Sequence, residues 1–182
     1  KMKKILLKNA KIVLENKLIN GSILIFKNKI ERIFTDKYNL SEFTFDEVID
    51  LEGKYLGPAF IDIHIHGADG ADVMDSSEEA LRKISSYLVQ EGTANFLATT
   101  LTSSKEILKE ILKVVANLQN KDIEGANIFG VHMEGPYFSI EYKGAQNDKY
   151  MKPAGIKELE EYLSVKEGLV KLFSISFFIK NC

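Results

Sequence analysis

The sequence is poor in several features that mark particular classes of protein. It contains a single cysteine, Cys182, which excludes a disulfide framework and suits a reducing compartment. Lysine and arginine are scattered and the formal net charge is −2, so the basic stripe that binds nucleic acid is missing. No stretch reaches the roughly 18 apolar residues of a membrane span, and the apolar run behind Met2 is too short for a signal peptide. These features predict a cytoplasmic protein with no nucleic acid and no membrane as partners.

The first part of the chain is rich in short β-strand patterns. Of the 182 residues, 45% are apolar and 27% charged, which are ordinary values for a protein with a packed core. Runs of β-branched residues alternate with the turn dipeptides Asn20-Gly21 and Lys27-Asn28. The predicted strands are residues 5–7, 10–14, 22–26, 29–33 and 48–51. Residues 1–57 are therefore predicted to form a small β-rich domain.

From Pro58 onward, strand and helix patterns alternate strictly. Strands are predicted at 59–66, 94–101, 128–134 and 170–176, helices at 78–91, 104–119 and 156–163, and a long loop at 135–155. Such alternation is typical of parallel βα units. A (β/α)₈ barrel typically needs about 250 residues. Residues 58–182 are thus predicted to be the first half of a TIM barrel, of about four strands.

Two of these helices have recognisable starts and apolar faces. Ser76 with Glu79, and Ser103 with Glu106, match the capping-box pattern that begins a helix, and Gly92 suits the end of the first helix. The residues expected to face the core are Leu81, Ile84 and Leu88 in the first helix and Ile107, Ile111, Val115 and Leu118 in the second.

The first barrel strand carries two histidines at its end. Because side chains alternate along a strand, Asp62, His64 and His66 share one face. Ile61, Ile63 and Ile65 share the opposite face, where helices would cover them. Two imidazoles so placed can bind one metal ion. By itself the pattern fits equally well a pair of histidines on a solvated strand tip.

The third barrel strand adds a histidine and a carboxylate in the same phase. His132 and Glu134 point to one face, and Phe129, Val131 and Met133 to the other. Barrel active sites are built from the carboxyl ends of the strands. His64, His66 and Glu134 are therefore predicted to lie within reach of one ion. A solvated loop carboxylate is the weaker interpretation of Glu134, because it lies in phase with His132 within an apolar strand.

These motifs resemble the N-acetylglucosamine-6-phosphate deacetylase family of the amidohydrolase superfamily, from about residue 5 to residue 176. The resemblance is carried by Asp62–Gly67, Gly67–Asp72, Glu91–Thr100, His132–Pro136 and Lys143–Asn147. It implies hydrolysis of N-acetylglucosamine 6-phosphate, a small phosphorylated amino sugar, to glucosamine 6-phosphate and acetate. It also implies one or two divalent metal ions, with Zn favoured and Fe or another transition metal possible. Members of the family also have a β domain built from both chain ends, and the full-length proteins are homodimers.

The resemblance also implies roles for individual residues. Glu134 matches the principal metal ligand, and His64 and His66 match ligands of members that hold a second metal. Ala145 and Gln146 match positions that touch the amino sugar, although Gln146 also reads as an ordinary polar loop residue. His132 and Asp62 are expected to support the ligands rather than to bind the ion.

The chain departs from the family pattern in ways that leave other interpretations open. The family uses two further histidines and an aspartate base on later strands, but no histidine follows His132, so the catalytic residue is not identified. The sequence after Ser176 reads as a truncation or a shifted frame, and Ala59 replaces the usual glycine. One alternative is therefore a non-catalytic fragment, inactive alone. Another is an amidohydrolase acting on a different amide, such as a cyclic one. Those enzymes often use a modified lysine on strand 4, where Lys171 is at the wrong end.

Overall fold

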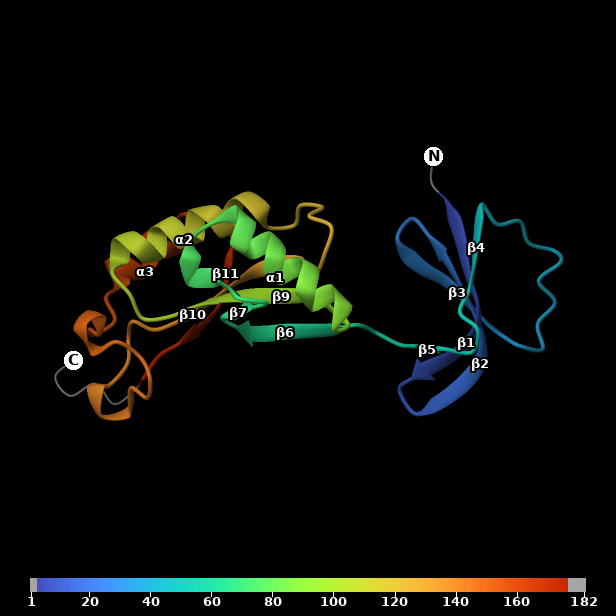
Figure 1. Ribbon diagram of the computed structural model, residues 1–182, viewed down its shortest axis with the longest axis horizontal. Helices are drawn as coiled ribbons and strands as arrows, with labels where there is room; N and C mark the ends of the chain where they lie inside the picture. Colours follow the sequence, from blue (N-terminus) through green and yellow to red (C-terminus); the bar gives the residue numbers. More distant parts are fainter. Residues whose placement is uncertain (1–2, 177–182) are drawn as a thin grey trace. The chain divides into compact units, whose positions relative to one another are not determined.

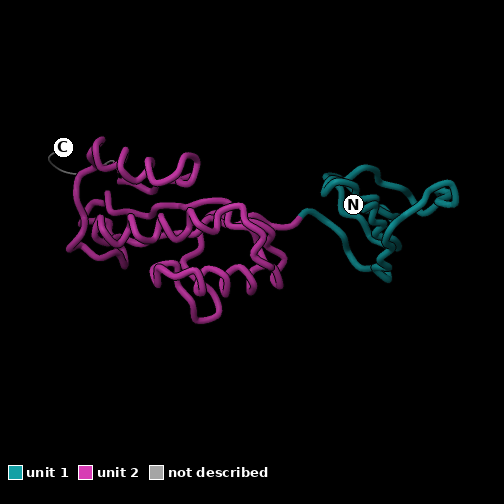
Figure 2. The backbone as a smooth tube through the Cα atoms, turned by 90° about the horizontal axis from the view of Figure 1, so that it is seen from above, with its two compact units in different colours: residues 1–58 teal, residues 59–182 magenta. Residues whose placement is uncertain are grey.

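The structure, a computed structural model, describes residues 3–176 (Figure 1). The predicted truncation or frame shift after Ser176 falls on residues that lie outside the described ones. The chain divides into two compact units, Lys1–Pro58 and Ala59–Cys182 (Figure 2). None of the helices found between residues 3 and 176 is long and apolar enough to pass through a membrane.

The first unit is built around a five-stranded sheet. Its strands are β1 (Lys4–Leu14), β2 (Lys17–Phe26), β3 (Lys29–Thr35), β4 (Glu47–Asp50) and β5 (Tyr55–Leu56). β1, β2 and β3 pair antiparallel in sequence order, while β4 and β5 both run parallel to β1. Apolar side chains of these strands form two small cores, one around Leu6, Leu24 and Phe34 and the other around Ala10, Ile12 and Ile23.

Two local predictions for this unit are wrong and one is confirmed. Residues 4–14 form a single strand with a bulge, where Asn9 takes a φ of 57°, instead of two strands. Asn20-Gly21 lies inside β2 and is no turn. Gly21 is required there because a Cβ would collide with the carbonyl oxygen of Phe34 on β3. Lys27-Asn28 does form the predicted turn, with φ values of 53° and 58° that suit a type I′ hairpin.

The second unit is a parallel sheet with the strand order β11-β10-β9-β6. Its main elements are β6 (Phe60–Ile65), α1 (Glu78–Gln90), β9 (Thr93–Thr100), α2 (Lys105–Leu118), β10 (Asn127–Glu134), α3 (Ile156–Leu163) and β11 (Val170–Ser174). Four parallel strands connected by helices confirm the predicted partial (β/α)₈ barrel. Several small elements were not predicted: the hairpin β7 (Gly67–Ala68) and β8 (Ala71–Asp72), and the 3₁₀ turns Val73–Asp75, Ile140–Tyr142 and Asp148–Tyr150.

One face of this sheet packs against the helices (Figure 1). The fully or nearly fully buried residues include Leu81, Ile84 and Leu88 of α1, Ile111, Val115 and Leu118 of α2, and Phe96, Ile128, Val131 and Met133 of the strands. α1 begins at Glu78 as predicted and α2 begins one residue later than predicted, but in both helices the capping serine is one residue later than the predicted one. The hydroxyl of Ser77 accepts a hydrogen bond from the amide of Ala80, and that of Ser104 accepts one from the amide of Ile107. Gly92 follows α1 with a φ of 83°, as a helix end requires.

Some residues predicted to be in the core are exposed. Ile107 is 40% exposed, because α2 buries the face that carries Leu108 instead. Phe129 is 46% exposed, since a bulge in β10 between residues 128 and 130 turns its side chain out of the alternation. Ile61 and Ile63 on the sheet-edge strand β6 are 62% and 57% exposed, because no described helix covers them.

Candidate metal centre

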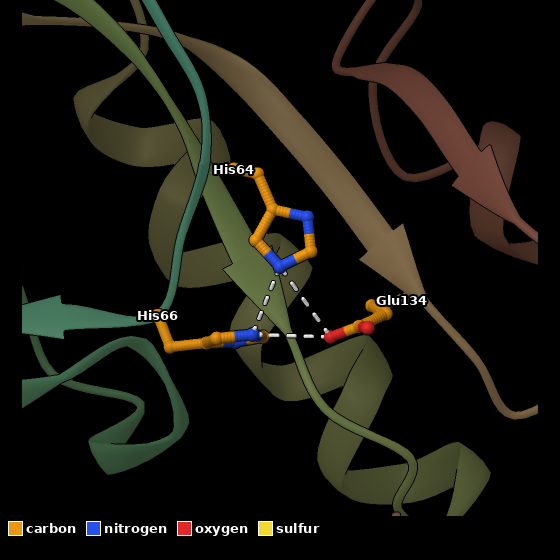
Figure 3. A group of neighbouring side chains, drawn as sticks. All are labelled: His64, His66 and Glu134. Carbon is orange, nitrogen blue, oxygen red and sulfur yellow. Dashed lines mark hydrogen bonds and ion pairs between the residues drawn. The ribbon is translucent and has the colours of Figure 1, made fainter. Parts of the chain in front are cut away.

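Three side chains meet where two parallel strands end (Figure 3). His64 lies near the end of β6, His66 directly follows it, and Glu134 is the last residue of β10. The Nε2 atom of His66 is 3.0 Å from Oε2 of Glu134 and 3.2 Å from Nε2 of His64, and His64 Nε2 is 3.7 Å from the same oxygen. The strand phases predicted this proximity. The described residues join these three groups to no further histidine, cysteine or carboxylate ligand.

The ring of His66 is held by the neighbouring strand. Its Nδ1 lies 3.1 Å from the carbonyl oxygen of Thr99 on β9. A carbonyl oxygen only accepts hydrogen bonds, so Nδ1 carries the proton, and Nε2 is left with a lone pair facing Glu134. The hydroxyl of Thr99 also accepts a hydrogen bond of 3.0 Å from the amide of Ile65. Thr99 therefore fixes both the strand end and the tautomer of His66.

The donor atoms suit a divalent cation. With His66 in this tautomer, its Nε2 and the carboxylate of Glu134 both present lone pairs across 3.0 Å, which is repulsive unless a cation or a proton lies between them. Tetrahedral ligands with bonds of about 2.0–2.1 Å stand roughly 3.3 Å apart, close to the separations observed. Imidazole and carboxylate are ligands of Zn, Fe and related ions.

His132 of β10 lies next to His64 and is 2% exposed. Its Nδ1 is 3.1 Å from the carbonyl oxygen of Ile63, and its Nε2 is 2.8 Å from the hydroxyl of Ser174 at the end of β11. Its ring meets that of His64 edge-on, with centroids 4.9 Å apart. Burial lowers the pKa of His132, a shift that the nearby histidines reinforce and that the Ile63 carbonyl and Glu134 oppose. The sequence analysis did not identify Thr99 and Ser174 as hydrogen-bond partners of the site, because the residues they bind are distant in sequence.

The remaining predicted site residues have different surroundings. Asp62 accepts a hydrogen bond of 2.9 Å from the amide of His64 through Oδ1. Gln146 accepts one of 2.8 Å from the amide of Thr102 through Oε1, which ties the loop after β10 to the end of β9. Ala145 is exposed. Within residues 3–176, neither Ala145 nor Gln146 forms a hydrogen bond or an ion pair with the three clustered ligands.

Comparison with known proteins shows which family the chain resembles. The model of the amidohydrolase family matches residues 55–179. N-acetylglucosamine-6-phosphate deacetylase of Bacillus subtilis (strain 168) is 34% identical over 176 residues, which cover 94% of this chain and 44% of that protein. N-acetylgalactosamine-6-phosphate deacetylase of Escherichia coli O157:H7 is 31% identical over 129 residues, which cover 71% of this chain and 34% of that protein.

Solved structures give the same picture of the fold. N-acetylglucosamine-6-phosphate deacetylase from Pasteurella multocida superposes with a TM-score of 0.81 at 25% identity, covering 94% of this chain and 44% of that one. A variant of the Mycobacterium smegmatis enzyme, solved in complex with N-acetyl-D-glucosamine-6-phosphate, gives 0.75 at 20% identity, covering 96% and 44%, and shares the fold. The chain thus spans less than half the length of these relatives.

Proposed function

The chain belongs to the amidohydrolase family, and we propose that it serves in the metal-dependent deacetylation of N-acetylglucosamine 6-phosphate. In this reaction water adds to the acetamide carbonyl carbon, the carbon–nitrogen bond breaks, and the departing amine takes up a proton. The products are acetate and glucosamine 6-phosphate. The observation that carries the proposal is the meeting of His64, His66 and Glu134 at the strand ends, in a chain whose curated relatives are amino-sugar phosphate deacetylases.

In this proposal the three clustered side chains hold the ion. Glu134 contributes the negative charge and lies closest to His66. We expect the ion to be Zn, with Fe or another transition metal as alternatives. Each site would hold one or two ions. A bound divalent ion supplies Lewis acidity, which polarises a carbonyl group and makes water a better nucleophile. His132 and Asp62 keep the β6 ligands in place, and His66 keeps its lone pair available through Thr99.

The proposed sugar contacts are Ala145 and Gln146. Because Oε1 of Gln146 is occupied by the amide of Thr102, its terminal NH₂ group is left as the outward donor. A donor suits a sugar hydroxyl or a phosphate oxygen. An intracellular setting belongs to the same proposal, because a charged sugar phosphate does not cross a membrane unaided. A homodimer is expected for the full-length protein.

A general base and further ligands are still needed for turnover. The described residues bring together three ligand groups, all of them assigned to the ion in this proposal. We place the base and the other ligands in the part of the relatives' length that this chain does not span. General acid–base assistance is typically worth about 10²–10⁴-fold in rate, so the 182-residue polypeptide is expected to be inactive alone.

Two other substrates can be compared with this one. N-acetylgalactosamine 6-phosphate is favoured by one observation, the E. coli relative that is named for it. A cyclic amide with a lysine-bridged metal pair is disfavoured, because Lys171 is the second residue of β11, is exposed, and has its Nζ 5.0 Å from the ring centre of Phe129.

Acetate release by the full natural protein tests the proposal. We expect release from both N-acetylated amino-sugar 6-phosphates, loss of activity on removal of metal, and recovery on adding Zn²⁺. Glu134→Gln keeps the size of the side chain, removes its charge and should abolish turnover. Lys171→Met is the matched control and should leave activity unchanged. Metal-free protein that turns over normally, or a Glu134→Gln variant with full activity, would contradict the proposal.

A further inference from the structure

The strand that carries His64 and His66 is irregular where the histidines lie. Along β6 and β9, Asp62 pairs with Phe96 and Ile65 pairs with Ala98, so three steps on β6 match two steps on β9. An extra residue of this kind removes backbone groups from the regular ladder of hydrogen bonds. The freed groups need other partners if this strand end is to have one conformation.

Side chains supply those partners around the peptide group that joins Ile63 to His64. Its carbonyl oxygen accepts a hydrogen bond of 3.1 Å from Nδ1 of His132, and its N–H donates one of 2.9 Å to Oδ1 of Asp62. His132 belongs to β10, which is separated from β6 in the sheet by β9. Its side chain therefore reaches past a whole strand to hold this peptide group.

His132 is itself tightly fixed. A carbonyl oxygen accepts only, so Nδ1 carries the proton, and Nε2 accepts from the hydroxyl of Ser174 at 2.8 Å. With 2% exposure, the imidazole has no freedom to turn toward solvent. The same ring contacts the ring of His64 edge-on. His132 thus contacts both the backbone that carries His64 and the imidazole of His64.

The two β6 ligands are consequently supported in different ways. His66 is oriented by the main-chain carbonyl of Thr99, so its hydrogen-bond partner is a backbone group. His64 has a side chain 48% exposed, and its described hydrogen-bond, ion-pair and ring contacts are with His66, Glu134 and His132. The placement of His64 therefore depends on His132.

We infer that His132 is a positioning residue for the metal centre: by binding the bulged Ile63 carbonyl and packing against the ring of His64, it sets where His64 Nε2 points. This inference rests on the metal site of the proposed function. Groups that orient metal ligands in this way typically contribute 10–100-fold to metal affinity. The affinity of the folded protein for the ion, rather than its stability alone, should therefore respond to substitution of His132.

Titration of the metal-free, full natural protein with Co²⁺ tests the inference, with binding followed by visible absorption and folding by circular dichroism. His132→Phe keeps the ring and loses both hydrogen bonds, and should weaken Co²⁺ binding by about 10–100-fold with an altered spectrum. In His132→Asn the side-chain amide nitrogen is bonded to Cγ, as Nδ1 is in histidine, so it can still donate to the carbonyl oxygen of Ile63. The Co²⁺ affinity of this variant should be within a few-fold of the wild-type value. His132→Gln has its amide at the position of Nε2, away from Ile63, and should resemble His132→Phe.

Ser85→Ala is the matched control. Ser85 is fully buried and donates a hydrogen bond of 2.6 Å to the carbonyl oxygen of Ala126, but it lies on α1 outside the cluster. This variant should lose stability and keep its Co²⁺ affinity and spectrum. If His132→Phe behaves in the same way, His132 has only a structural role and the inference is overturned. If His132→Phe does not fold, the Asn and Gln variants decide, and equal or reversed affinities overturn it. Wild-type protein that binds no Co²⁺ contradicts the proposed function itself.

Discussion

Replacement of Glu134 should cost more metal affinity than replacement of His64. Glu134 is the one anionic side chain of the cluster, and its side chain is 22% exposed against 48% for His64. The four-ligand zinc sites of zinc-finger peptides have apparent binding free energies of about 10–16 kcal/mol, or about 2.5–4 kcal/mol per ligand, which is a factor of about 10²–10³ in affinity. Water can replace the half-exposed imidazole of His64, so His64→Ala should fall at the low end of this range. Glu134→Ala loses both a ligand and its charge and should reach or exceed the high end.

The assay is competition for Zn²⁺ against a chelator of known affinity, supported by elemental analysis of the purified variants in the full natural protein. Circular dichroism establishes that each variant is folded. Glu134→Gln separates the two contributions, because it keeps an oxygen ligand and removes the charge. A loss for His64→Ala that equals or exceeds the loss for Glu134→Ala would refute the ranking and the reasoning from charge and exposure.

Four further results are expected. Ile111→Ala, at a fully buried position of α2, should lower the free energy of unfolding by about 2–5 kcal/mol, whereas Ile107→Ala, 40% exposed, should cost less than about 1 kcal/mol; urea denaturation compares them. Gly135→Ala, at a φ of 85°, should cost more than about 1 kcal/mol and weaken metal binding, because the strain adjoins Glu134. Hydrogen bonds from Lys105 and a second lysine of α2 hold the pKa of Glu161 below its usual range. Ionised Glu161 therefore stabilises the fold at pH values above its pKa in the unfolded chain, about 4.3. This stabilisation is lost as the pH falls through its pKa in the folded chain. The difference in unfolding free energy between wild type and Glu161→Gln should therefore shrink as the pH falls below about 4.3, and a constant difference would count against this ion pair. Finally, the isolated 182-residue polypeptide should release no acetate and should self-associate through the exposed apolar face of β6. Sedimentation and an acetate assay test this, and a monomer with normal turnover would refute the claim that its site is incomplete.

The alternating direction of side chains along the strands was the most informative feature of the sequence for predicting the site. The two-residue period placed His64, His66 and Glu134 on one face, and the parallel βα pattern placed their strand ends together. Period and order are local properties, so they can be derived without knowing any contact. The helices α1 and α2 were predicted for the same reason, with an error of one residue in the capping serine of each, because neighbouring serines at 76–77 and 103–104 compete as caps.

Bulges and burial by distant elements were not predictable. Nothing in the local pattern indicates that β10 inserts a residue at Phe129, or that β6 does so before Ile65, because a bulge depends on the fit to the partner strand. Gly21 looked like a turn since its nearest neighbour, the backbone of Phe34, lies on another strand. The link from Ser174 through His132 to the Ile63 carbonyl joins three strands, so it became visible only once the sheet order was known.

The central claim is that Glu134, His64 and His66 are the metal ligands that this chain contributes. Anomalous X-ray diffraction at the zinc absorption edge, from crystals of the full natural protein loaded with Zn²⁺, tests it most directly. We predict a peak within about 2.0–2.2 Å of the Glu134 carboxylate, with Nε2 of His66 or His64 bound to the same ion or to a second one close by. A peak elsewhere, with these three side chains free of metal, would contradict the account.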